Sequence, residues 1–304
     1  MKKQKILIHI FSFPSGIDAL ERTLILLKQN LTNVDKAKFH LILDITLSMS
    51  NYFIDWENSI LKQDYFEDKF KKLEVYGDEF DEINFNIDYD SEGALKYTVG
   101  KIYQYHDIDN MIWLDTDIVF NQYTLGYILE STIQLNKHHS KYILTPEYVK
   151  MWDGSWDILV NKNFLDKPND PLYVLINDPI TDSTPLYGEI SLEPLVYNNQ
   201  KIFKFGGGWF TVFSKELLDF IEFPRDTVGY CAIDTYIMDF CKYIPDAIQY
   251  KVKNLVICED RKYNKTVYSS YVKNIDRKFS SYQSSWDKLV IHMQNKINGI
   301  PKFK

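Results

Sequence analysis

Residues 111–120 read MIWLDTDIVF, in which four apolar residues lead directly into the acidic pair Asp115 and Asp117. A short apolar run of this kind predicts a buried strand over residues 111–114, with the two aspartates at its carboxyl end. Two carboxylates two residues apart form a compact anionic corner, and a bend at the strand end brings both toward one cation. Because Mg²⁺ and Mn²⁺ prefer oxygen ligands, this stretch predicts a divalent metal site at the tip of a central strand.

Further buried strands are predicted upstream of this corner. Residues 5–11, KILIHIF, and residues 39–45, FHLILDI, are nearly continuous apolar runs, and the second ends near Asp44. Between them, one helical stripe is formed by the leucines Leu20, Leu24, Leu27 and Leu31. Strands that alternate with helices predict βαβ units and a mostly parallel sheet. Ligands bind such sheets at the carboxyl ends of the strands, so Phe13, Asp44 and Asp115 are expected on one rim.

Elsewhere the pattern is weaker but still alternates. Helices are predicted over residues 55–73, 92–105, 215–222 with Ser214 as the N-cap, and around 233–240. Strands are predicted over residues 73–76, 141–145 and within 203–213. The final 45 residues are polar and are expected to wrap back over the domain. No repeat or low-complexity linker interrupts the chain, which favours one continuous domain.

The composition argues against several classes of protein. The 304 residues are 45% hydrophobic and 25% charged, which favours a substantial core over disorder. The net charge of −7, with dispersed basic residues, argues against a nucleic-acid partner. The first apolar run, about six residues, is too short for a signal peptide, and no transmembrane segment is expected. The three cysteines form no CxxC pair, which favours a reducing, cytoplasmic location.

Four segments of the chain resemble segments of one enzyme family. MIWLDTDIVF resembles the DxD strand of glycosyltransferases with the GT-A fold. KILIHIFSFPSGIDALERTL, from residue 5, resembles their first strand, nucleotide-binding loop and first helix. FGGGWFTVFSKELLDF, from residue 205, resembles their glycine-rich acceptor strand, and CAIDTYIMDF, from residue 231, resembles the acidic segment that follows it. The order of these segments matches the family over most of the chain.

The resemblance implies a GT-A fold, which is an α/β fold with a Rossmann-like, mostly parallel central sheet flanked by helices in a single domain. It implies that residues 1–120 bind a nucleotide sugar, that residues 121–260 bind the acceptor, and that residues 261–304 close over the site. The implied reaction moves a sugar from a nucleoside diphosphate sugar, with a UDP-sugar as the favoured donor, to a hydroxyl of a glycan, lipid or protein. The identity of the sugar, retention or inversion at the anomeric carbon, and the oligomeric state stay open.

The resemblance also assigns residues to the donor and the metal. The pocket for the base and ribose is implied to be lined by Phe13, Pro14 and Asp44. Mn²⁺ or Mg²⁺ is implied to be held by Asp115, Asp117 and His292, with Asp115 also facing the nucleotide. Lys302 is implied to contact a phosphate, although the gap between His292 and Gly299 is longer than in the family pattern.

On the acceptor side, Asp234 is implied to be the base that activates the attacking hydroxyl. Gly207 and Gly208 allow a close approach of the backbone to a ligand, and Trp209 offers a ring that can stack on a sugar. Trp152 belongs to a WD-x-x-WD pattern and is assigned to a loop near the donor or the acceptor.

Two other functions are compatible with the same residues. Leu114–Val119 also matches the DxDx[TV] pattern of haloacid-dehalogenase-like phosphatases, with Asp115 as the nucleophile and Asp117 as the acid or base. That family carries its DxD on the first strand, whereas three strand-like units come first here. The 22 tyrosines and 6 tryptophans are also compatible with a non-catalytic sugar-binding protein.

Overall fold

One half of the central sheet consists of parallel strands in the order β3 (Glu82–Asp88), β2 (Phe39–Ser48), β1 (Gln4–Ser12) and β4 (Asn110–Leu114). The computed structural model describes residues 2–49, 54–89, 104, 106–116, 118–120, 122–150, 156–158, 190–204, 210–222, 233–259 and 276–299. Ile8 of β1 lies opposite Leu43 of β2 and Ile112 of β4. Both faces of β1, β2 and β4 are buried, which explains why their sequences are almost uninterrupted apolar runs.

The other half of the sheet is mixed. β11 (Phe210–Ser214) is antiparallel to both β4 and β6 (Tyr142–Lys150). β6 is parallel to β12 (Ile248–Glu259), and β5 (Ile118–Val119) is antiparallel to β12 at the edge. Shorter strands complete this half: β7 (Trp156–Ile158) beside β6, β8 (Leu192–Pro194) beside β12, and the β9 (Val196–Tyr197) and β10 (Gln200–Lys201) pair. The result is one mostly parallel, mixed sheet.

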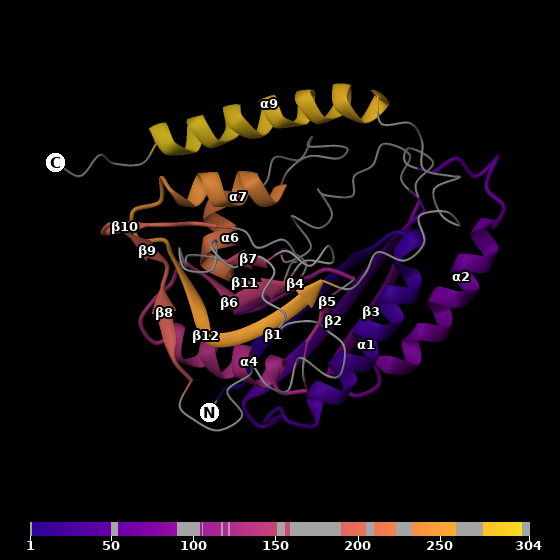
Figure 1. Ribbon diagram of the computed structural model, residues 1–304, viewed down its shortest axis with the longest axis horizontal. Coiled ribbons are helices and arrows are strands. Elements are labelled where there is room, and N and C mark those ends of the chain that lie inside the picture. Colours follow the sequence, from indigo (N-terminus) through magenta and orange to yellow (C-terminus); the bar gives the residue numbers. More distant parts are fainter. Residues whose placement is uncertain are drawn as a thin grey trace.

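Helices cover both faces of this sheet (Figure 1). On one face, α1 (Ile17–Leu31), α2 (Gln63–Lys72) and α4 (Thr124–Leu135) pack against side chains such as Ile8 of β1. On the other face, α6 (Lys215–Ile221) and α7 (Ile233–Cys241) pack against side chains such as Leu7 and Trp113, and α9 (Asp276–Asn298) lies over α7. Each fully buried leucine of α1 contributes on the order of 2 kcal/mol. Among the described residues, no helix combines the length and apolar character needed to cross a bilayer.

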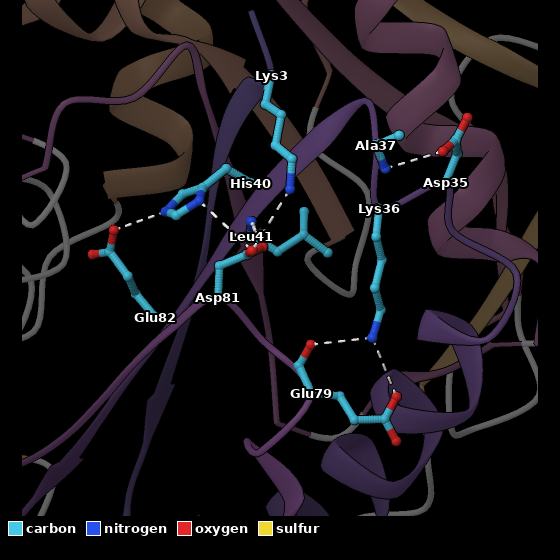
Figure 2. A network of polar contacts seen from close by, with 9 residues as sticks. All are labelled: Lys3, Asp35, Lys36, Ala37, His40, Leu41, Glu79, Asp81 and Glu82. Carbon is cyan, nitrogen blue, oxygen red and sulfur yellow. Dashed lines mark hydrogen bonds and ion pairs between the residues drawn. The ribbon is translucent and has the colours of Figure 1, made fainter.

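The amino ends of the first strands carry an exposed network of charged side chains (Figure 2). Asp81 accepts the backbone N–H of Leu41 at 2.8 Å, and its carboxylate lies 3.7 Å from His40 and 3.9 Å from Lys3. His40 Nε2 lies 2.7 Å from Glu82 Oε1. Exposed pairs of this kind contribute up to about 1 kcal/mol each. The network lies at the opposite end of the strands from Asp115.

Most of the predicted elements are confirmed. The strands predicted over residues 5–11, 39–45, 111–114, 141–145 and within 203–213 correspond to β1, β2, β4, β6 and β11. The leucine stripe is the buried face of α1, and the predicted helices over 215–222 and 233–240 correspond to α6 and α7. Only Gln104 of the helix predicted over 92–105 belongs to the described residues.

Several boundaries and one strand were predicted wrongly. Residues 73–76 form a 3-10 helix, η2 (Leu73–Tyr76), and the third parallel strand is β3. The helix expected from residue 55 begins only at Gln63. The second strand continues past Asp44 to Ser48. Ser214 precedes α6, but its Oγ accepts the backbone N–H of Tyr142 at 3.0 Å and makes no cap hydrogen bond.

Candidate active site

Asp115 directly follows β4 and is half-buried at the carboxyl edge of the parallel strands. β1 lies beside β4, and Phe13 directly follows β1 at the same edge. The expectation that these two residues share one rim is therefore confirmed. The backbone then leaves the line of β4, because β5 begins at Ile118 and pairs with β12 at the far edge of the sheet. Asp115 and Thr116 thus lie where the chain passes from β4 to a distant strand.

The loop between β1 and α1, residues 13–16, contacts this bend. Pro14–Gly16 form a 3-10 turn, η1, in which the N–H of Gly16 donates to the carbonyl of Phe13 at 2.8 Å. A Cβ added to Gly16 would lie 3.1 Å from Oγ1 of Thr116, closer than most real Cβ contacts. A larger residue at this position would therefore force Thr116 to shift by a few tenths of an ångström. Gly16 was not among the residues predicted for the site.

Phe13 and Pro14 differ in exposure within that loop. Phe13 is half-buried, and its ring meets the ring of Phe11 edge to face, with centroids 5.4 Å apart. Pro14 is buried. Their assignment to a base and ribose pocket stays a prediction.

Asp44 does not lie at the strand end, as predicted, but inside β2, four residues before its last residue. Its carboxylate is 2% exposed, and Oδ1 lies 3.0 Å from Nδ1 of His9 in the neighbouring strand. Oδ2 lies 3.4 Å from Nδ2 of Asn86 and 3.7 Å from Nε2 of His106. The carboxylate is therefore engaged by internal partners. Whether it also contacts a nucleotide stays a prediction.

His292 lies in α9, half-buried, with Nε2 3.1 Å from the carbonyl oxygen of Ile221 at the end of α6. A carbonyl oxygen only accepts, so Nε2 carries the proton in this contact, and Nδ1 is the nitrogen left for a metal. Lys296, one turn further along α9, pairs with Glu222 after the end of α6. These contacts fasten α9 to α6. The metal-ligand role of His292 stays a prediction.

The other predicted site residues are not described in the same detail. Asp117, Trp152, Gly207, Gly208, Trp209 and Lys302 lie outside the described residues. Asp234 lies in the first turn of α7, but only its backbone is described. Within the described part of the chain, no group of three or more His, Cys, Asp or Glu side chains is arranged to hold a metal.

Comparison with known proteins identifies the fold. No protein-family model matches the sequence, and no curated protein is significantly similar to it. The structure of GalNAc-T7 with UDP, GalNAc and Mn²⁺ matches with a TM-score of 0.56 and 9% identity, over 95% of this chain and 48% of that chain. S. aureus TarS 1–349 with UDP-GlcNAc matches with a TM-score of 0.51 and 11% identity, over 95% of this chain and 66% of that chain.

A second complex of S. aureus TarS 1–349, with UDP, matches with a TM-score of 0.50 and 11% identity, over 99% of this chain and 67% of that chain. The chain thus spans about half the length of GalNAc-T7 and about two thirds of TarS 1–349. At identities this low, the likeness establishes the architecture rather than the chemistry. This chain has the GT-A fold, as its sequence predicts.

Proposed function

We propose that this protein is a metal-dependent glycosyltransferase that moves a sugar from a nucleoside diphosphate sugar to a hydroxyl of its acceptor. The observation that carries the proposal is the position of Asp115, which is half-buried, directly after β4, and followed by Thr116, whose side chain approaches Gly16. Ligands of open α/β sheets bind at this edge. A UDP-sugar is the favoured donor, because the GalNAc-T7 and TarS structures with this fold contain UDP or UDP-GlcNAc.

The proposed metal is Mn²⁺ or Mg²⁺, held by Asp115 and Asp117 with His292 as a further ligand. Carboxylate oxygens suit either ion, and a histidine favours Mn²⁺, which the GalNAc-T7 structure contains. When bound, such an ion neutralises the charge that develops on a diphosphate leaving group. Lys302 is proposed to support the same phosphates.

The remaining assignments divide the site into a donor side and an acceptor side. On the donor side, Phe13, Pro14 and Asp44 are proposed to contact the base and ribose. The acceptor is proposed to meet Asp234 as its base, together with Gly207, Gly208, Trp209 and Trp152. The proposed place of Gly207, Gly208 and Trp209 near the metal is supported by β11, which follows them in the chain. Its first residue, Phe210, pairs with Leu114, the residue before Asp115. The acceptor is a glycan, a lipid or a protein.

The phosphatase alternative is disfavoured by the order of the strands. β1, β2 and β3 all precede β4 in the chain, so the acidic motif follows the fourth parallel strand rather than the first. The non-catalytic alternative predicts sugar binding that does not depend on a divalent ion.

A thermal-shift panel tests the proposal. The protein is heated with UDP, GDP, ADP or their sugar conjugates, each with and without Mn²⁺. A ligand at 100 times its Kd adds about 2.7 kcal/mol, which raises the Tm of a domain this size by roughly 5 °C. The proposal predicts such a shift for one base, only with the metal, and release of UDP from the matching sugar nucleotide.

One variant of the acidic motif and one control variant test whether the shift depends on Asp117. Asp117→Ala should abolish the metal-dependent shift and leave the Tm of the free protein unchanged. Asp68→Ala, on the exposed surface of α2, is the matched control and should behave like the wild type. Shifts that are equal with and without metal, or equal in Asp117→Ala and wild type, would refute the assignment.

A further inference from the structure

Thr23, in the middle of α1, contacts the backbone on both sides of Asp117. Its Oγ1 lies 2.8 Å from the carbonyl oxygen of Thr116 and 3.4 Å from that of Ile118. Carbonyl oxygens only accept, so the single Thr23 O–H is the donor, chiefly to Thr116 and more weakly to Ile118. The side chain is 1% exposed, so water does not compete for the hydroxyl. One buried hydroxyl therefore links α1 to the acidic motif.

These two contacts limit how far apart the carbonyl oxygens of Thr116 and Ile118 can lie. The carbonyl oxygens of Thr116 and Ile118 cannot be farther apart than the two distances placed end to end, 6.2 Å. In an extended strand, equivalent atoms two residues apart are separated by about 6.4–6.8 Å. The hydroxyl thus holds the carbonyl groups of Thr116 and Ile118 closer together than an extended strand would. The proposed metal site needs such a bend to bring Asp115 and Asp117 toward one cation.

A second contact holds the same segment from the start of α1. The position of a Cβ on Gly16 would be 3.1 Å from Thr116 Oγ1 and 3.4 Å from Ser12 Oγ. Gly16 directly precedes α1, and Thr23 lies within it. The side chain of Thr116 therefore packs against Gly16 of the loop, and its carbonyl group accepts a hydrogen bond from Thr23 of α1.

We infer that Thr23 is a positioning residue for the metal site, because its hydroxyl holds the carbonyl groups of Thr116 and Ile118, the two neighbours of Asp117 in the chain. The inference rests on the proposed function. Thr23 does not touch the metal or the substrate; it acts through the backbone of the two ligands. Loss of groups that orient metal ligands typically weakens metal affinity 10- to 100-fold. Thr23→Val keeps the shape of the side chain and removes the hydrogen-bond donor. It is expected to weaken the affinity for Mn²⁺ at least about tenfold.

The chain offers a matched control in Thr132 of α4. Thr132 is also fully buried, but its Oγ1 donates to the carbonyl of Leu129 in its own helix at 2.7 Å. Hydroxyls of Ser and Thr in helices commonly bond the preceding turn in this way. Thr132→Val therefore removes a buried hydroxyl without disturbing the acidic motif. Thr23→Ser keeps the donor and is the conservative variant.

The experiment measures the affinity for UDP by titration calorimetry over a series of Mn²⁺ concentrations, together with urea unfolding of each protein. The expected result is a Mn²⁺ midpoint raised at least about tenfold in Thr23→Val and within about threefold of wild type in Thr23→Ser and Thr132→Val. The affinity for UDP without metal should not differ among the four proteins.

The outcomes separate the inference from the proposed function. Equal Mn²⁺ midpoints in wild type and Thr23→Val overturn the inference, even if Thr23→Val is less stable to urea. If Thr23→Val does not fold, Thr23→Ser decides, because a shifted midpoint in that variant contradicts the role of the hydroxyl. A wild type whose affinity for UDP does not respond to Mn²⁺ overturns the proposed function itself.

Discussion

Replacing Asp44 by Ala is expected to reduce the free energy of unfolding by about 3 kcal/mol. Asp44 and His9 are 2% and 0% exposed, and their hydrogen bond is 3.0 Å long. His9 Nε2 is buried and has no hydrogen-bond partner in the described part of the chain. Loss of the Asp44 carboxylate therefore removes the partner of His9 Nδ1, the other nitrogen of the ring. A buried polar group without a partner costs about 1–3 kcal/mol, and the shortened side chain leaves unfilled space.

A second histidine–carboxylate pair in the same protein provides the matched control. His40 Nε2 lies 2.7 Å from Glu82 Oε1, with side chains 25% and 52% exposed (Figure 2). This pair is shorter than the pair of His9 and Asp44. Because water solvates both partners, Glu82→Ala is expected to cost less than about 1 kcal/mol. Distance alone would predict the opposite order of the two effects.

The assay is urea unfolding followed by circular dichroism, with Asp44→Asn as a third variant. The Asn side chain retains an acceptor oxygen for His9, so its cost is expected to be about 1–2 kcal/mol. Equal losses for Asp44→Ala and Glu82→Ala would refute the claim that burial sets the strength of these pairs. An Asp44→Asn variant of unchanged stability and weakened affinity for UDP would instead show that this carboxylate faces the nucleotide.

Three further changes test other parts of the structure. Gly16→Ala places a Cβ 3.1 Å from Thr116 Oγ1, so it should weaken Mn²⁺-dependent UDP binding roughly threefold or more while stability changes by less than about 1 kcal/mol; unchanged calorimetric affinity would count against the contact. Lys251→Met removes a cation from Glu147, which is 5% exposed, and should cost about 3 kcal/mol in urea unfolding. Leu24→Ala should cost about 3 kcal/mol by the same measurement, and a loss below 1 would contradict its core position.

The strands that are buried on both faces could be predicted from the sequence. β1, β2 and β4 contain the residues KILIHIF, FHLILDI and MIWL, whose apolar character comes directly from burial between two layers of helices. β3 could not be predicted, because this edge strand is half-exposed and its sequence, EINFNID, is interrupted by polar residues. Its place was assigned instead to residues 73–76, which form a 3-10 helix.

The site was predictable to a similar degree. The position of Asp115 follows from a short apolar run that ends in an acidic residue. The sequence predicts Asp44 at a strand end, because a polar residue that follows an apolar run usually marks one, whereas β2 continues to Ser48. His9 lies opposite Asp44 in the neighbouring strand. Two polar residues at matching positions of adjacent buried strands indicate such a pair, but they can be recognised only when the register of β1 and β2 is known. The contact of Thr23 with Thr116 joins residues 93 apart and has no local signal in the sequence.

The metal site at Asp115 can be tested by counting bound Mn²⁺ with electron paramagnetic resonance, which detects the free ion. We expect one Mn²⁺ per chain when UDP is present, much weaker binding without UDP, and none with UDP in Asp115→Asn. Mn²⁺ that stays free in the wild type with UDP, or binds equally to Asp115→Asn, would contradict the claim that this corner holds a divalent ion for a nucleotide diphosphate.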